Sequence, residues 1–265
     1  MIIVTLTKNS ESTIKDTIKS IKEQNIKNLF WLIFDDKSTD LTVDIISKCP
    51  IPHKIFYTNS KSIYEAWNIA LRLINKKKIK DIIFFLASDD IISNKNLLND
   101  VDKIFKRHQV DLLYGNISIF IKNKKVIFRK WNAAFKEKQI RIANSLYCLK
   151  KISKKDLIKG WIFPHNSLFF NSKIISNLNF YDTKYKISAD YLWSLKLLFK
   201  NKFKIFFLDK NIINMRYGGT STNIRNILNV LIEDWKILYK FYNKNFFYTI
   251  FTIFFKKMRK LNQFI

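Results

Sequence analysis

Two adjacent carboxylates follow a strongly apolar run in the first half of the chain. Asp89 and Asp90 come just after FFLAS, and residues 82–86 before them are all hydrophobic. A single Asp at such a point often caps a helix or closes a turn. Two together repel each other, and a bound cation relieves that repulsion. Mg²⁺ and Mn²⁺ take one or two carboxylates together with phosphate oxygens, so the pair predicts a divalent metal site that holds a diphosphate.

Polar side chains also follow two other apolar runs. Asp35 and Asp36 open the segment DDKSTD after residues 30–34, and Thr5 lies near the end of residues 2–6. Carboxylates accept hydrogen bonds from the N–H groups of a nucleotide base and from ribose hydroxyls. We therefore expect Asp35 and Asp36 to bind a nucleoside, with Thr5 beside them at the adjoining strand end.

The elements that position these groups form a repeating pattern. Short apolar runs at 2–6, 30–34, 54–57 and 82–86 read as strands, and segments with helical spacing of apolar residues separate them. This order predicts a parallel sheet with right-handed crossovers, in which ligands bind at the carboxyl ends of the strands. Residues 111–120 and 124–131 alternate as antiparallel strands do, so the second half is expected to be mixed.

Charge and composition narrow the classes of function. The 265 residues are 48% hydrophobic and carry a formal net charge of +27. Such a field attracts polyanions and anionic lipid, although an AT-rich coding sequence also enriches Lys together with Ile, Asn and Phe. The basic residues are scattered rather than gathered with interleaved aromatic residues. We predict no nucleic-acid partner.

The cysteines and the N-terminus predict a cytoplasmic protein. Cys49 and Cys148 lie far apart, with no pairing typical of a disulfide framework or a zinc site. The opening MIIVTLTKNS lacks the pattern of a signal peptide.

The C-terminal segment predicts a contact with the inner face of the membrane. Residues 246–255 would span about 15 Å as a helix, against about 30 Å of hydrocarbon, so they cannot cross it. No acidic residue follows Asp234, whereas aromatic, aliphatic and basic residues abound. This composition suits an anionic membrane surface. A terminal helix packed on the protein with a solvated basic face is the alternative.

Several segments together resemble one enzyme family. VTLTKNSESTIKDTIKSIKEQ, FWLIFDDKSTDLTVDII, SIYEAWNIAL and FFLASDD resemble, in order and spacing, the family-2 glycosyltransferases of GT-A type. FPHNSLFF and YKISADYLWSLKL resemble acceptor-side segments of bacterial polysaccharide and lipopolysaccharide enzymes, and the likeness runs over about residues 1–221. It implies an α/β, GT-A (Rossmann-like) fold with a mostly parallel central sheet flanked by helices, a mixed second half and a helical tail.

The resemblance also implies roles for individual residues. Asp36 and Asp35 would bind the nucleoside, Asp90 would ligate Mn²⁺ or Mg²⁺ with Asp89 beside it, and Asp190 would be the catalytic base. Further donor contacts are expected from Thr5, Tyr64, Asn68 and Ser88.

Three more residues are assigned contacts with the acceptor or a phosphate, namely His165, Gly218 and Gly219. For His165 the alternative is a hydrogen-bonded core histidine, and for the glycine pair it is a plain turn. This chain also departs from the family pattern, because Lys37, Leu41 and Ser62 stand where glycines are usual and Ser60 where an acidic residue is common.

These expectations define a function. The chain is expected to be an inverting glycosyltransferase that uses a nucleotide sugar, UDP-linked, and a glycan or lipid-linked acceptor in bacterial surface polysaccharide synthesis. Residues 1–222 would be the catalytic domain, with a nucleotide-binding half at 1–93 and an acceptor-side half at 94–222, and residues 223–265 a basic, aromatic helical extension. The alternatives are a non-catalytic module of the same fold that binds anionic glycan or membrane, and a metal-dependent nucleotidyltransferase. The latter lacks support because no Gly-rich phosphate loop follows the first strand.

Overall fold

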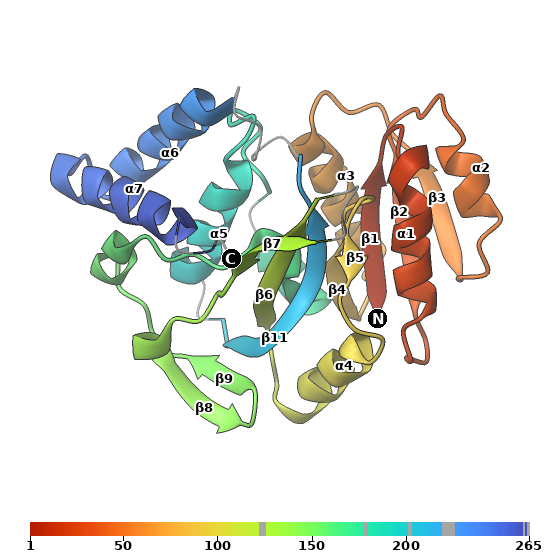
Figure 1. The fold of residues 1–265 in the computed structure, drawn as a ribbon, viewed down its shortest axis with the longest axis horizontal. Coiled ribbons are helices and arrows are strands. Elements are labelled where there is room, and N and C mark those ends of the chain that lie inside the picture. The colour runs from red at the N-terminus through yellow and green to blue at the C-terminus, as the bar shows by residue number, and fades with distance from the viewer. Residues whose placement is uncertain (122–125, 178–179, 201–202, 219–225, 262, 264–265) are drawn as a thin grey trace.

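The protein is built around one mixed sheet of eleven strands. The computed structural model describes residues 1–121, 126–177, 180–200, 203–218, 226–261 and 263. The strand order is β3-β2-β1-β4-β10-β6-β11-β9-β8, with β5 paired to β11 and β7 to β6. Figure 1 shows the first four strands on one side of the molecule and the last two helices on the other.

The first half is the parallel part of the sheet. It contains β1 (Ile2–Thr7), β2 (Phe30–Asp35), β3 (His53–Tyr57) and β4 (Ile82–Phe85), connected by α1 (Glu11–Lys22), α2 (Thr42–Ser47) and α3 (Ile63–Lys76). β2 and β4 both pair in parallel with β1, and β3 pairs in parallel with β2. The carboxyl ends of these strands therefore meet along one edge, as the sequence predicted.

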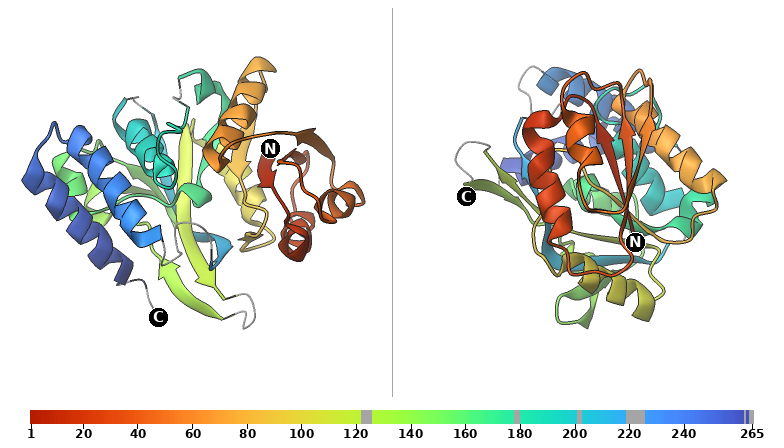
Figure 2. Two further views of the ribbon diagram at one scale, coloured as in Figure 1. Left: turned by 90° about the horizontal axis from the view of Figure 1, so that it is seen from above. Right: turned by 90° about the vertical axis from the view of Figure 1, so that its right-hand side faces the viewer.

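Alternating side chains along each strand build a core on both faces of the sheet. Ile3 and Trp31 face one way and pack with residues of α1, α2 and α4 (Leu97–Arg107). Val4 and Leu32 face the other way and pack with α3 and α5 (Ala189–Lys200). The two layers of helices are visible on either side of the sheet in Figure 2.

The second half mixes strand directions, again as expected. β10 (Phe169–Asn171) runs antiparallel between β4 and β6 (Leu112–Phe120), whereas β11 (Ile205–Arg216) runs parallel to β6. The remaining strands are β5 (Ile91–Ile92), β7 (Ile127–Trp131), β8 (Gln139–Ala143) and β9 (Leu146–Leu149). The segment KIFFLD, residues 204–209, is strand-like in sequence, but β11 extends well past it. The register of β11 shifts between Leu208 and Ile213, and pairing with β6 then resumes. Its far end lies beside the Asp89–Asp90 turn.

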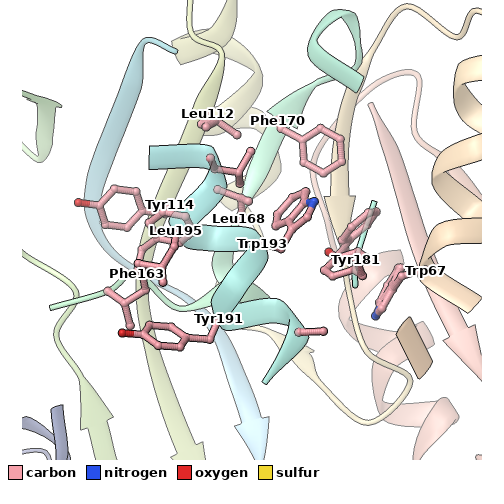
Figure 3. Close-up of a cluster of buried hydrophobic side chains, with 14 of the residues drawn as sticks. Trp67, Leu112, Tyr114, Phe163, Leu168, Phe170, Tyr181, Tyr191, Trp193 and Leu195 are labelled. Carbon is pink, nitrogen blue, oxygen red and sulfur yellow. The ribbon is translucent and has the colours of Figure 1, made fainter. Parts of the chain in front are cut away.

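An aromatic cluster fixes α5 against the sheet and α3. Trp193 of α5 stacks on Tyr181, with ring centroids 5.0 Å apart, and also meets the edge of Phe170 from β10. Trp67 of α3 stacks on Phe85 at 4.1 Å. Figure 3 shows these rings gathered around α5. The first turn of α5, which carries Asp190, is thereby held in place.

The last two helices, α6 (Ile227–Phe241) and α7 (Phe246–Leu261), lie side by side at one end of the molecule (Figure 1). α7 packs on a short 3₁₀ turn, η2 (Lys155–Lys159). Gly160 ends this turn with φ +69°, and a Cβ at this position would lie 2.2 Å from the backbone nitrogen of Lys256. Only glycine fits there, because the backbones of the turn and the helix are in contact.

Two sequence predictions about this end have different outcomes. Among the described helices, none is long and apolar enough to cross a membrane. The predicted boundary at residue 222 falls within residues 219–225, which lie outside the described part of the chain, so the division into two domains stays a prediction.

Candidate active site

Asp89 and Asp90 lie in a tight turn between β4 and β5. The backbone carbonyl of Asp90 accepts a hydrogen bond from Thr17 of α1 at 2.9 Å, and its side chain is almost fully buried, at 1% exposure. One carboxylate oxygen of Asp90, Oδ2, receives a long contact of 3.5 Å from the amide of Asn166. Burial and the neighbouring Asp89 raise the pKa of Asp90 well above its ordinary value. Burial likewise raises the pKa of Asp89.

These carboxylates meet the chemical requirements of a hard divalent cation. No group of three or more His, Cys, Asp or Glu side chains able to hold a metal occurs among the described residues. A metal at this position would therefore take its remaining oxygen ligands from outside the protein, as Mg²⁺ and Mn²⁺ do when they bridge a carboxylate and a diphosphate. Two buried, repelling carboxylates fit such a cation.

Arg216 lies next to Asp89, although sequence reasoning assigned it no role. It ends β11 and is 7% exposed. Its Nε donates to the backbone oxygen of Asp89 at 3.2 Å, and its Nη2 forms an ion pair with Asp16 at 2.8 Å. In the sequence, Arg216 stands two residues before the Gly218–Gly219 pair, and this position was the available signal of a role in the site. Because it is anchored on both sides, Arg216 holds a positive charge next to the two aspartates.

Asp35 is tied into the turn after β2. Its Oδ1 accepts from Thr7 at 2.7 Å and from the Ser38 hydroxyl at 2.6 Å, and its Oδ2 accepts from the Ser38 backbone N–H at 2.9 Å. It is 1% exposed. Asp35 thus shapes the predicted nucleoside-binding turn, and its contact with a base stays a prediction.

Asp36 is more accessible and strongly hydrogen-bonded. Its Oδ1 accepts from the Ser60 backbone at 2.7 Å, and its Oδ2 pairs with Lys8 at 3.0 Å. Partial burial raises its pKa, but the hydrogen bonds from Ser60 and Lys8 outweigh this and lower the pKa overall. The next residue, Lys37, has φ 57°, a left-handed conformation that a glycine adopts freely. The turn therefore keeps the shape that the missing glycine would allow, at a cost of about 1–2 kcal/mol.

Thr5 and Ser88, two predicted donor contacts near strand ends, are hydrogen-bonded within the protein. Thr5 is fully buried, and its hydroxyl accepts from the Trp31 indole at 2.8 Å. Thr7, two residues on, bonds Asp35, because Thr7 is the residue paired with Asp35 in the sheet. The Ser88 hydroxyl shares a hydrogen bond with Ser10 at 2.8 Å and thus links the residue before α1 to the Asp89–Asp90 turn. The donor contacts of Thr5 and Ser88 stay predictions.

Asp190 lies in the first turn of α5. Its Oδ1 accepts from the Tyr191 backbone N–H at 2.7 Å and from the Tyr64 hydroxyl at 3.3 Å. Within the described part of the chain, no donor reaches its second oxygen, Oδ2. The side chain is half-buried. One oxygen is thus oriented and the other is open to accept a proton.

Glu233 of α6, unnoticed in the sequence, fixes the segment that leads to Asp190. Its carboxylate accepts three backbone hydrogen bonds, from Lys186 at 2.8 Å, Ile187 at 3.0 Å and Ser188 at 2.8 Å. A negatively charged carboxylate near the N-terminus of a helix, here α5, also interacts favourably with the helix dipole. Glu233 is therefore a positioning residue supplied by the C-terminal helices.

The two α3 residues predicted near the donor differ in their position relative to the site. Tyr64 borders the site and its hydroxyl donates to the backbone oxygen of Ile187. Asn68 does not border it: the amide exchanges two hydrogen bonds with the backbone of Tyr181, at 3.0 and 2.8 Å. These bonds hold the Asn68 side chain against the loop before α5, and its contact with a donor stays a prediction.

His165 is enclosed by aromatic rings. One ring nitrogen, Nε2, lies 2.6 Å from the Tyr181 hydroxyl, and burial lowers the pKa of the imidazole. It borders the site, so contact with a substrate stays a prediction. Gly218 follows β11 with φ +118°, which glycine alone adopts readily. Gly219 lies outside the described residues.

One open cavity brings five of the predicted site residues together. Its lining includes Tyr64, Asp89, Asp90, His165 and Asp190. Asn166, Lys186, Met215 and Arg216 also contribute, and none of these was singled out from the sequence. Thr5, Asp35, Asp36, Asn68 and Ser88 do not border it, although Asp36 and Ser88 lie along the same edge of the sheet.

Comparison with known proteins identifies the family. The sequence model for glycosyl transferase family 2 matches residues 2–178. The chain belongs to this family. It is 28% identical over 220 residues to the Escherichia coli UDP-Glc:alpha-D-GlcNAc-diphosphoundecaprenol beta-1,3-glucosyltransferase WfaP, a match that covers 77% of this chain and 82% of the relative.

Solved structures show the same fold. TarS residues 1–349 from Staphylococcus aureus, in complex with UDP-GlcNAc, gives a TM-score of 0.64 at 20% identity and covers 92% of this chain and 72% of that one. GalNAc-T7 with UDP, GalNAc and Mn²⁺ gives a TM-score of 0.61 at 14% identity, covering 88% and 49%. The GT-A fold expected from the sequence is confirmed.

Proposed function

We propose that this family-2 glycosyltransferase transfers a sugar from a nucleoside-diphosphate sugar to a hydroxyl of a lipid-linked glycan, with inversion at the anomeric carbon, in bacterial surface polysaccharide synthesis. The donor is UDP-linked, and Asp90 with Asp89 holds Mn²⁺ or Mg²⁺ against the diphosphate. Support for the donor comes from WfaP, whose name gives UDP-Glc as donor, and from the fold neighbours that bind UDP-GlcNAc, or UDP with Mn²⁺.

The observation that carries the proposal is the position of Asp190 between two cavities. It borders the cavity that contains Asp89 and Asp90, and also a second cavity that extends toward α6 and α7. A donor in the first cavity and an acceptor in the second would meet at this carboxylate. Its unbonded oxygen is then available to the attacking hydroxyl.

The reaction is a single displacement. Asp190 removes the proton from the acceptor hydroxyl, and the oxygen forms a bond to the anomeric carbon. The bond from that carbon to the diphosphate breaks on the opposite side, and its electron pair leaves with the nucleoside diphosphate. When bound, the metal stabilises the charge that develops on the leaving phosphate. Arg216, fixed beside Asp89, adds positive charge to the same corner.

Lipid-linked acceptors are presented at a membrane, and α7 offers a surface suited to it. Eight of its large hydrophobic side chains are exposed along one stripe, which we call the α7 apolar stripe: Phe246, Phe247, Ile250, Phe251, Phe254, Phe255, Met258 and Leu261. Lys257, Arg259 and Lys260 flank its end. An apolar stripe bordered by cations fits the headgroup region of an anionic leaflet. We propose a peripheral contact with the inner face of the cytoplasmic membrane.

The test is calorimetric titration of the purified protein with UDP, GDP, dTDP and CMP, with and without Mn²⁺. We expect metal-dependent binding of UDP that is lost in Asp90→Ala and Asp90→Asn. Asp44→Asn on the exposed surface of α2 serves as the matched control and should bind as the unchanged protein does. A folded protein that binds no nucleotide would contradict the proposal and favour a non-catalytic module.

A further inference from the structure

The second cavity is formed jointly by the catalytic sheet and the C-terminal helices. On one side it is bordered by His165 and Asp190, and on the other by Asp234 of α6 and by Lys256 and Lys260 of α7. Trp131 and Tyr191 contribute aromatic rings to its lining. An apolar, aromatic cavity with a few fixed polar groups is typical of a small-ligand site.

This cavity shares residues with a larger groove along α7. The groove shares Trp131, Ile162, Lys256 and Lys260 with the inner cavity. It is also bordered by Phe254, Phe255 and Met258 of the α7 apolar stripe. Lys256 and Lys260 thus stand where the two spaces meet, between Asp190 and the apolar stripe.

Lys256 is rigidly held there. Its Nζ pairs with Asp234 at 2.8 Å and lies 3.4 Å from the ring centroid of Tyr191. Asp234 is 1% exposed, and its other oxygen has no partner in the described part of the chain. One buried carboxylate is therefore matched by one fixed ammonium group.

Lys260 has no such match. Among the described residues, neither a hydrogen bond nor an ion pair reaches its ammonium group. Burial and the neighbouring Lys256, Lys257 and Arg129 lower its pKa to about 8, although Asp234 opposes the shift. A partly buried cation among other cations costs free energy unless an anion binds beside it.

We propose that Lys260, together with Lys256, binds the phosphate or diphosphate that joins the acceptor sugar to its lipid carrier. This rests on the proposed function and adds the chemistry of the acceptor. The acceptor sugar occupies the inner cavity next to Asp190, the charged linkage lies at the two lysines, and the first part of the lipid follows the groove beside Phe254 and Met258. Lys260 supplies a positive charge that no carboxylate of the described residues pairs with, and Lys256, already paired with Asp234, adds N–H donors.

The kinetic test compares two soluble acceptors that carry the same sugar and the same short alkyl tail, one through a diphosphate and one through a plain glycosidic oxygen. In Lys260→Ala we expect KM for the diphosphate acceptor to rise about tenfold, equivalent to about 1.4 kcal/mol, with KM for the donor unchanged. KM for the uncharged acceptor should not change. Lys236→Ala is the matched control, because Lys236 carries the same charge on the neighbouring helix α6, is exposed and borders neither space. An equal change for both acceptors, or none, would overturn the proposal.

A binding measurement separates this inference from the proposed function. Pyrophosphate is titrated into metal-free protein saturated with UDP, or into the protein alone if UDP does not bind. We expect binding that Lys260→Ala weakens and Lys236→Ala does not. Equal binding to all three proteins would contradict the site even if the enzyme is active. If vesicles of phosphatidylglycerol displace pyrophosphate from Lys260 but the diphosphate acceptor does not, the lysines bind lipid headgroups and the acceptor assignment is wrong.

Discussion

Individual aspartates in this protein differ through their surroundings. Asp35 is saturated with hydrogen bonds from its own turn, Asp36 is stabilised in its charged form, and Asp90 is buried beside another carboxylate with its pKa raised. Asp190 keeps one open oxygen at the junction of two cavities. The roles proposed for them, namely a structural turn, a ligand contact, a metal ligand and a base, would place the same residue type in four environments.

Asp190→Asn should separate chemistry from binding. The amide is nearly isosteric and can keep the hydrogen bond from the Tyr191 backbone, but it cannot take a proton. We expect kcat to fall about 10²- to 10⁴-fold, while calorimetric affinity for UDP stays within error.

The control for this variant is Asp182→Asn, in the segment before α5 but outside the cavity lining. It should retain full turnover. A kcat in Asp190→Asn within a few fold of the unchanged enzyme would remove Asp190 from the role of base.

Sequence reasoning found those site residues that belong to contiguous motifs. It placed Asp89, Asp90 and Asp190 in segments that the fold brings around one cavity. Thr5 and Asn68 lie outside the lining of this cavity, because a shift of two residues in a strand, or of one helical turn, decides which side chain reaches the edge. Glu233 and Lys260 were missed because their partners lie tens of residues away, and only the packing of α6 and α7 brings them to the site.

At the scale of elements, α7 shows how one helix can present two different faces. Thr249 and Thr252 are fully buried against the protein, whereas Phe247 is 69% and Phe254 54% exposed. The helix therefore packs on the catalytic part with a small, polar face and presents large apolar side chains to its surroundings. This division is unfavourable in water and favourable at a bilayer surface.

Replacing Phe247 and Phe251 with Ser should weaken membrane binding. Both belong to the α7 apolar stripe, and burying one Phe side chain contributes about 1.5–3 kcal/mol. We expect the affinity for phosphatidylglycerol vesicles to drop by about tenfold or more in a flotation assay.

The matched control replaces Ile140 and Ile142 of β8, which are also exposed, with Ser. These changes remove apolar surface elsewhere on the molecule and should leave vesicle binding intact. If both double variants bind as the unchanged protein does, α7 is only a packed terminal helix.

Most elements were predictable because their apolar residues repeat with a clear period. The four parallel strands and α1, α3 and α4 belong to this group. β11 was underestimated because the polar residues Asp209, Lys210 and Asn211 interrupt its apolar pattern where the register shifts. Tertiary pairing with β6 continues the strand through a segment whose local sequence favours an end.

At the scale of the whole molecule, the formal charge of +27 acts over longer distances than any contact. It adds a general attraction to anionic surfaces on top of the apolar stripe. This attraction is screened by salt, whereas the burial of apolar side chains is not.

Vesicle binding should therefore depend on salt in two stages. The Debye length falls from about 10 Å at 0.1 M to about 3 Å at 1 M salt, so we expect affinity for anionic vesicles to drop between these conditions. A residual binding that is insensitive to salt should remain, and it should be absent in the Phe247→Ser, Phe251→Ser variant. Binding that salt abolishes completely in the unchanged protein would mean that charge alone holds it to the membrane.

The contact between Gly160 and the backbone of α7 has a consequence for how this enzyme can diversify. Contact between the backbone at Gly160 and the backbone of α7, rather than contact between side chains, sets how closely α7 packs on the protein. The outward residues of α7 can therefore be exchanged without displacing Lys256 from its place beside Asp234. Adaptation to a bilayer of different composition and adaptation to a different acceptor sugar can thus proceed as separate evolutionary events, each on its own set of positions in a single sixteen-residue helix.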